Sequence, residues 1–163
     1  MKKTLLTFSL ASLLAACGAG VSDVRFDHGV ASGDPLADAV ILWTRVTPVD
    51  AGDPRPVPVV WEVAEDDAFA AVVREGEAVT DGAADYTVKV DAGGLAPGRT
   101  YFYRFRVGAA VSPVGRTRTL PVGPVERLGL AVVSCSNYPA GYFNVYRAIA
   151  GRGDGRLAEV PCS

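Results

Sequence analysis

The sequence is short of cysteine, histidine and long apolar runs, and each shortage excludes a class of protein. Three cysteines in 163 residues are too few for a disulfide framework, and zinc-ligand spacings of the CxxC or HxxxH type are absent. The net charge of −2 gives no basic field for nucleic acid. The chain also has no P-loop, GxSxG or HExxH motif. It is still 49% hydrophobic, which is enough to bury the core of roughly one domain.

The first residues predict export. The stretch MKKTLLTFSLASLLAAC places two lysines before an apolar segment, residues 5–14, that falls short of the roughly 20 residues of a membrane span. Leu14–Cys17 resembles the lipobox of bacterial lipoproteins, which makes residues 1–16 a signal peptide and residues 17–24 a linker. We expect a protein of the bacterial periplasm or cell surface with a membrane anchor on a lipidated Cys17. A plain secretory signal with an incidental cysteine is the alternative.

Residues 25–120 predict a β-sandwich. Apolar and polar residues alternate in several short runs that are separated by Gly- and Pro-containing turns, at the spacing typical of sandwich domains. Pro58 lacks an N–H group, so its end of a strand is expected at a sheet edge. The segment Phe69–Val79 is interpreted as a weak strand pair or a strand followed by a turn. The expected strands are Ala37–Val46, Val57–Val63, one or two within Phe69–Val79, Asp85–Asp91, Arg99–Val107 and Val114–Leu120.

Two aromatic residues refine the sandwich prediction. The stretch LAPGRTY, Leu95–Tyr101, resembles the turn before the sixth strand of fibronectin type III domains, where the tyrosine hydroxyl bonds back to the backbone. Trp43 is expected to fill the core. Both residues are therefore interpreted as structural.

A second unit is expected after a Pro- and Gly-rich linker, residues 121–127. The run LGLAVVS, Leu128–Ser134, predicts a buried parallel strand, and Tyr142, Val145, Tyr146 and Ile149 follow at helical spacing. The order strand, loop and helix predicts that residues 128–150 are the beginning of an α/β domain. Residues 151–163 are expected to be an irregular tail.

Cys135 lies at the end of that strand, where open α/β sheets place their ligands. As a thiolate it could bind a metal, and Asn137 could add an oxygen ligand or contact the substrate. A buried structural cysteine is the alternative, because free cysteine is among the most buried residue types. A bridge from Cys135 to Cys162 is possible, although the spacing does not require it.

Two stretches together resemble one family. FDHGVASGDPLADAVILWTRVTP (26–48) and VVSCSNYPAGYFNVYRAIA (132–150) are similar to the PhoD-type alkaline phosphatase/phosphodiesterases. The resemblance implies a fibronectin-like N-terminal domain followed by the start of a metallophosphoesterase-like catalytic domain. It also implies iron bound by Cys135 with calcium nearby, and metal-assisted hydrolysis of phosphate mono- and diesters as the activity.

The sequence departs from this family after Ala150. The Gly-Asp-Tyr motif and the later Asp, Asn and His motifs of the family are missing, and one cysteine cannot hold iron and calcium. We therefore expect a truncated chain without catalytic activity. A lipid-anchored β-sandwich that acts as a binding or structural module is the alternative. His28 is interpreted as structural or surface-exposed, and the aspartates between residues 23 and 38 as solvated.

Overall fold

The computed structural model describes residues 23–126 and 144–151, and the statements below concern these residues. The chain divides into two compact units, Met1–Val122 and Gly123–Ser163, which are considered separately. None of the described helices is both long enough and apolar enough to cross a membrane.

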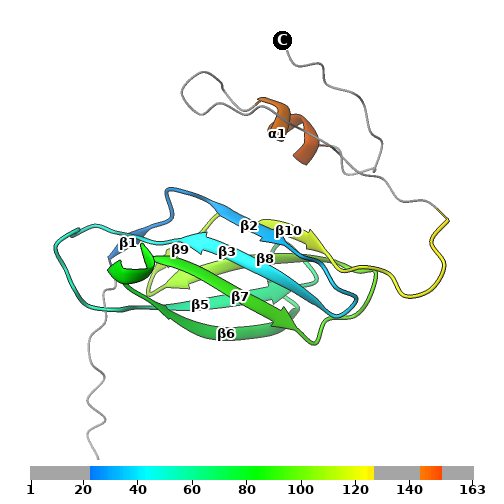
Figure 1. The fold of residues 1–163 in the computed structure, drawn as a ribbon, viewed down its shortest axis with the longest axis horizontal. Coiled ribbons are helices and arrows are strands. Elements are labelled where there is room, and N and C mark those ends of the chain that lie inside the picture. Colours follow the sequence, from blue (N-terminus) through cyan, green and yellow to red (C-terminus); the bar gives the residue numbers. More distant parts are fainter. Residues whose placement is uncertain (1–22, 127–143, 152–163) are drawn as a thin grey trace, which may run out of the picture. The chain divides into compact units, whose positions relative to one another are not determined.

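The first unit is a β-sandwich, as the sequence predicts (Figure 1). A three-stranded sheet has the order β2-β3-β7, and a larger sheet has the order β10-β8-β5-β6, with β9 paired to β8. Two very short strands, β1 and β4, pair with each other. The strands are β1 (Val24–Arg25), β2 (Val30–Gly33), β3 (Ala39–Arg45), β4 (Thr47–Pro48), β5 (Val57–Ala64), β6 (Val72–Thr80), β7 (Thr87–Gly93), β8 (Thr100–Val107), β9 (Ala110–Val111) and β10 (Gly115–Arg118).

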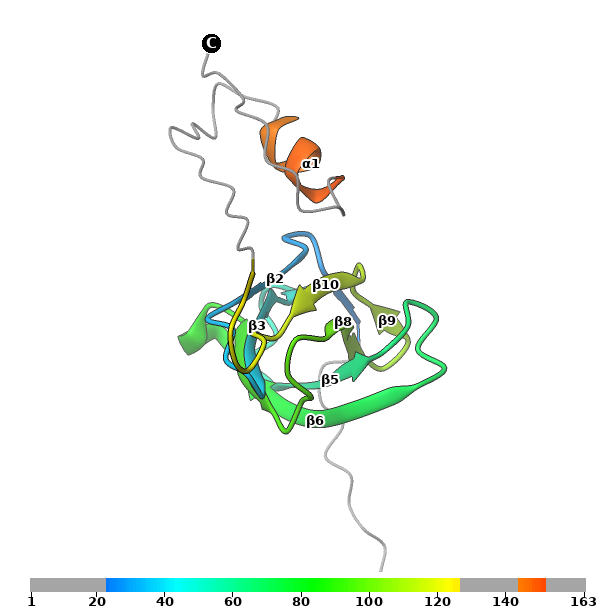
Figure 2. The same ribbon diagram turned by 90° about the vertical axis from the view of Figure 1, so that its right-hand side faces the viewer.

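All strand pairs are antiparallel, and the two sheets enclose one core. Strands of the two sheets meet at both edges of the sandwich: β6 lies next to β7 (Figure 1), and β10 lies next to β2 (Figure 2). Alternate residues of each strand point inward, because successive side chains of a strand face opposite sides of the sheet. The core consists of Val24, Val40, Leu42, Val46, Val57, Val59, Val63, Val88, Ala92, Leu95, Tyr101, Tyr103, Phe105 and Val107.

The predicted tyrosine corner is confirmed. The hydroxyl oxygen of Tyr101 accepts a hydrogen bond from the backbone N–H of Ala96 at 2.9 Å, and the side chain is buried. Gly98 has a φ of +67°, which is a left-handed conformation that favours glycine in this tight turn. The alternation in β8 is also confirmed, because Tyr101, Tyr103 and Phe105 all lie in the core.

The prediction that Trp43 fills the core is wrong. In β3 the inward residues are Val40, Leu42 and Thr44, so Trp43 lies on the outer face and is only partly buried. Trp61 of β5 packs against the core instead, with its indole over Gly76 of the neighbouring strand. A Cβ added at Gly76 would approach the Trp61 ring to 2.6 Å, so glycine makes room for this packing.

The edge prediction for Pro58 is confirmed, whereas the prediction for Phe69–Val79 needs correction. β8 pairs with β5 only over Val60–Ala64, so the end of β5 that holds Pro58 has no neighbour on that side among the described strands. The correction concerns β6, which is one continuous strand over Val72–Thr80 and pairs with β5 along its length. Gly76 interrupts the apolar alternation of β6, and the Trp61 ring occupies the space left by the missing side chain.

The described part of the second unit is one helix, α1 (Asn144–Ala150). It lies within the segment where the spacing of apolar residues predicts a helix. Tyr146 is 45% exposed and Ile149 is partly buried. The expected strand Leu128–Ser134 lies outside the described residues.

Candidate functional site

The residues that the sequence singles out for chemistry lie outside the described part of the chain. Cys135, the predicted metal ligand, and Asn137, the predicted substrate contact, both precede α1 in residues 127–143. Cys17, the predicted lipidation site, precedes Asp23. These three predictions therefore remain predictions.

The acidic residues of the first strands form no metal site. Among residues 23–126 and 144–151, no three His, Cys, Asp or Glu side chains come together in a way that could hold a metal ion. Asp27 pairs with Arg25 at 3.1 Å, and Asp23, Asp34 and Asp38 are exposed. His28 is exposed as well, which agrees with the surface interpretation.

The most buried charged group of the sandwich lies on the outer face of the larger sheet. The side chain of Glu62 is 8% exposed and accepts a hydrogen bond from Nε of Arg104 at 2.6 Å. Its second carboxylate oxygen lies 3.3 Å from Nη2 of Arg106. Glu62 and Arg104 are directly opposite each other on β5 and β8, so the strand register brings the ion pair together. We call Glu62, Arg104, Arg106 and Phe69 the outer-face cluster.

Phe69 completes the outer-face cluster from the loop between β5 and β6. The guanidinium carbon of Arg104 lies 3.9 Å from the centre of the Phe69 ring, which is a cation–π contact. Phe69 has a φ of 59°, an unusual conformation for a bulky residue. Asp66 stabilises this loop, because its carboxylate accepts the backbone N–H groups of Ala70 and Ala71 at 3.0 and 2.8 Å. These bonds also lower the pKa of Asp66.

Chemically, the outer-face cluster is suited to recognition rather than to proton transfer. Glu62 is bonded to two guanidinium groups, so its carboxylate is held as an acceptor. Arg104 and Arg106 are fixed by that same carboxylate while they keep 25% and 41% of their side chains exposed. The alternation in β8 predicts that both arginines face outward. It does not identify their common partner, because Glu62 is 42 residues away from Arg104 in the chain.

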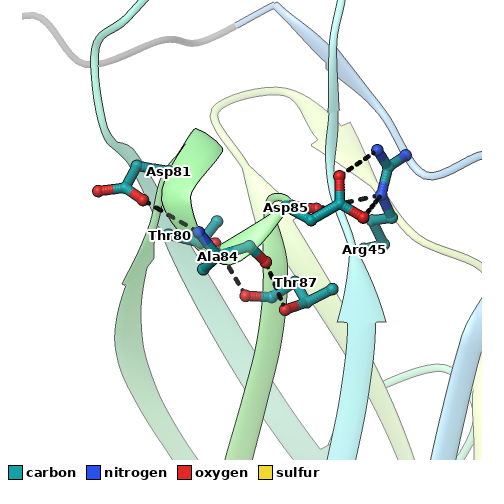
Figure 3. A network of polar contacts seen from close by, with 6 residues as sticks. All are labelled: Arg45, Thr80, Asp81, Ala84, Asp85 and Thr87. Atoms are coloured by element: carbon teal, nitrogen blue, oxygen red, sulfur yellow. Dashed lines mark hydrogen bonds and ion pairs between the residues drawn. The ribbon is translucent and has the colours of Figure 1, made fainter.

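A second polar network lies at one end of the smaller sheet (Figure 3). Arg45 of β3 donates from Nη2 to one carboxylate oxygen of Asp85 at 2.8 Å and from Nε to the other at 3.2 Å. The hydrogen bond to Arg45 lowers the pKa of Asp85. Asp85 follows the single 3₁₀ turn η1 (Gly82–Ala84) and has a φ of 51°.

The surrounding bonds of this network hold the connection from β6 to β7. The carboxylate of Asp81 accepts the backbone N–H groups of Ala83 and Ala84 at 2.9 and 3.3 Å, which caps η1. The hydroxyl of Thr80 donates to the carbonyl of Thr87 at 2.8 Å, and the hydroxyl of Thr87 donates to the carbonyl of Ala84 at 2.7 Å. These hydrogen bonds hold the β6–β7 turn in place, and the residues that make them are not arranged for catalysis.

Tyr103 is one of two buried tyrosines of the core. Burial raises the pKa of its phenol, and a hydrogen bond with the side chain of Ser32 acts in the opposite direction. A Cβ at Gly115 would clash with the Tyr103 ring, so the ring lies directly on the glycine of β10, its neighbour in the same sheet. Its hydrogen bond with Ser32 of β2 connects it to the other sheet.

Comparisons with known proteins agree with this architecture. The family model for the N-terminal domain of PhoD-like phosphatases matches residues 12–121. Alkaline phosphatase D of Bacillus subtilis (strain 168) is 44% identical over 135 residues, which cover 79% of this chain and 23% of that protein. A solved structure of PhoD superposes with a TM-score of 0.68 at 40% identity and covers 81% of this chain and 26% of the solved chain.

This chain thus spans about a quarter of the length of both relatives. The match includes all strands of the described sandwich, from β1 to β10. The chain belongs to the family of the PhoD-like phosphatase N-terminal domain.

Proposed function

We propose that this chain supplies the N-terminal β-sandwich of an exported PhoD-like alkaline phosphatase/phosphodiesterase. The enzyme hydrolyses phosphate mono- and diesters with the help of metal ions. The observation that carries the proposal is the 44% identity to alkaline phosphatase D, together with the family match over residues 12–121. The proposed location is the periplasm or cell surface, with a lipid anchor on Cys17.

The described sandwich does not fit the metals that the family resemblance implies. Iron and calcium need several ligands, and residues 23–126 and 144–151 offer no group of three candidate side chains. We therefore derive no catalytic step from the sandwich. Cys135 remains the proposed iron ligand, and the role proposed for the sandwich is to support the catalytic part of the enzyme.

A domain exchange tests this role. Residues 24–121 would replace the corresponding domain of Bacillus subtilis alkaline phosphatase D, and the chimera would be assayed with p-nitrophenyl phosphate and its bis-ester. We expect the chimera to keep activity within about tenfold of the parent, because the domain fits without taking part in the chemistry. The parent enzyme and a form without its N-terminal domain are the controls.

The 163-residue polypeptide by itself is assayed in parallel, with iron and calcium added. We expect no turnover, because Cys135 alone cannot supply the ligands of the implied iron and calcium ions. Turnover that disappears in Cys135→Ser would refute this expectation. A chimera that melts cooperatively but is inactive would instead favour a β-sandwich that acts as a separate binding module.

A further inference from the structure

The charges of the sandwich are separated along the chain. Residues 23–91 contain fifteen Asp and Glu against five Lys and Arg, whereas residues 92–125 contain five arginines and no acidic residue. The second segment forms β8, β9 and β10. A protein with a net charge of −2 thus carries one strongly basic surface.

Strand register places four of these arginines on one face. Arg104 and Arg106 point outward from β8, and Arg116 of β10 lies opposite the outward-facing Phe102. Arg118 lies two residues further along β10 on the same side, and both β10 arginines are exposed. We call these four residues the arginine face. Alternate residues of a strand lie about 7 Å apart and adjacent strands about 5 Å apart, so the four arginines form a row along β8 and β10.

The acidic residues of this sheet lie toward its opposite edge. Glu75 and Glu77 project from β6, which is separated from β8 by β5. Glu62 of β5 forms ion pairs with Arg104 and Arg106 and fixes their positions. The strands β8, β9 and β10 themselves contain the four arginines of the arginine face and no acidic residue.

Apolar side chains accompany these arginines. Val111 of β9 lies opposite Arg106 and is 50% exposed, and Val114, directly before β10, is 47% exposed. A surface that mixes exposed apolar side chains with arginines suits the headgroup region of a bilayer, where apolar groups insert and arginines meet phosphates. A free polyphosphate would use the arginines but would leave the valines in water.

The proposed anchor places such a surface within reach of the membrane. Seven residue steps separate Cys17 from Val24 at the start of β1, and an extended chain of that length spans at most about 25 Å. We propose that the arginine face, with Val111 and Val114, binds anionic phospholipid headgroups and so orients the sandwich on the membrane. The proposal rests on the proposed lipidation of Cys17, so the test measures the vesicle binding of a chain that carries no lipid.

The test uses the processed chain from residue 17 with Cys17→Ser, which carries no acyl chain. Its binding is measured by co-sedimentation with vesicles of phosphatidylglycerol and phosphatidylcholine in equal parts, and with vesicles of phosphatidylcholine alone. We expect binding only to the anionic vesicles, with a loss of binding as the salt concentration rises. The double variant Arg116→Glu and Arg118→Glu should lower the affinity by about 25-fold or more, on the basis of about fivefold for each arginine.

A matched control separates the face from the net charge. Arg25→Glu with Lys89→Glu makes the same change in charge at two exposed positions. Arg25 lies in β1, and Lys89 lies in β7 of the smaller sheet. We expect this variant to bind like the unaltered chain. Equal losses in both double variants, or equal binding to both kinds of vesicle, would overturn the proposal.

Inorganic polyphosphate provides the remaining arm of the test. If polyphosphate displaces the chain from vesicles and Val111→Ser with Val114→Ser leaves vesicle binding unchanged, the surface recognises free phosphate polyanions and the lipid proposal is wrong. If the valine variant loses several-fold in vesicle affinity, the lipid proposal is supported. These outcomes are independent of the catalytic assays, because they require neither metal nor turnover.

Discussion

The larger sheet carries an arginine–carboxylate pair on its outer face and the smaller sheet carries one at its end, and the two pairs differ in burial. On the larger sheet, the side chain of Glu62 is 8% exposed beneath the loop that holds Phe69. On the smaller sheet, the side chain of Asp85 is 76% exposed where it meets Arg45. Exposed ion pairs contribute little to stability, whereas breaking a buried pair leaves a charge without its partner. The burial of an ion pair, rather than the number of pairs, should therefore decide how much the charges of each sheet contribute to the stability of the fold.

The two tryptophans extend this comparison. Each lies in an inner strand of its sheet, yet Trp61 packs against the core and over Gly76, while Trp43 lies on the outer face. The same residue type thus contributes to the core in one sheet and to the surface in the other. Substitution at both positions separates these roles.

The largest effect is expected for Trp61→Ala. Removing this indole leaves a cavity beside the core and should lower the free energy of unfolding by about 3 kcal/mol. Trp43→Ala removes a half-buried side chain from the outer face and should cost about 1 kcal/mol. Urea unfolding followed by circular dichroism measures both values, because it does not depend on tryptophan fluorescence.

The double variant provides the control for independence. Trp61 faces the core from the larger sheet, whereas Trp43 faces outward from the smaller sheet. The costs of the two substitutions should therefore add to within about 0.5 kcal/mol. A cost for Trp43→Ala that equals or exceeds the cost for Trp61→Ala would contradict the assignment of Trp61 to the core.

These two residues also show how far the sequence predicts the fold. The run Val57–Val63 alternates, so its inward face, which includes Trp61, follows directly from a period of two. The run that contains Trp43 is almost continuously apolar and has no period that identifies a face. Its orientation is set by pairing with the preceding strand β2 and with β7, and β7 is distant in the chain, so part of that information is not local.

Some polar contacts of the sandwich can likewise be predicted from the sequence, and others cannot. The tyrosine corner is local, since Tyr101 bonds to Ala96 only five residues earlier, and a sequence motif predicts it. The pairing of Glu62 with Arg104 and Arg106 requires the strand order β8-β5, which no local pattern gives. The separation of charge between residues 23–91 and 92–125 was available in the sequence, but it becomes a surface only once β8 and β10 are neighbours.

The second prediction concerns the buried carboxylate. Glu62→Gln keeps the shape of the side chain but removes the charge that two guanidinium groups share, and should lower the free energy of unfolding by about 2 kcal/mol. Glu75→Gln is the matched control, since Glu75 lies opposite Glu62 on β6 and is exposed. Its effect should stay within about 0.5 kcal/mol. Thermal unfolding measures both variants, and equal effects would show that burial of Glu62 does not matter.

The smallest effect is expected for the exposed pair, and it should depend on pH. Because Arg45 lowers the pKa of Asp85 below 3.8 in the folded state, the folded protein binds its proton less readily than the unfolded chain. The pair therefore stabilises the fold above pH 3.8, and this contribution is lost as the pH falls through the lowered pKa. Asp85→Asn removes the charge but tolerates the left-handed backbone at this position.

We expect Asp85→Asn to be slightly less stable than the unaltered chain near neutral pH and equally stable at strongly acidic pH. Denaturant unfolding of both forms over the acidic range measures the difference, and added salt should reduce it because the pair is exposed to solvent. Arg45→Gln should show the same convergence, and the double variant should add nothing further, since the two residues act through one contact. A difference that persists at the acidic end would instead mean that the side chain of Asp85 stabilises the fold by something other than its charge.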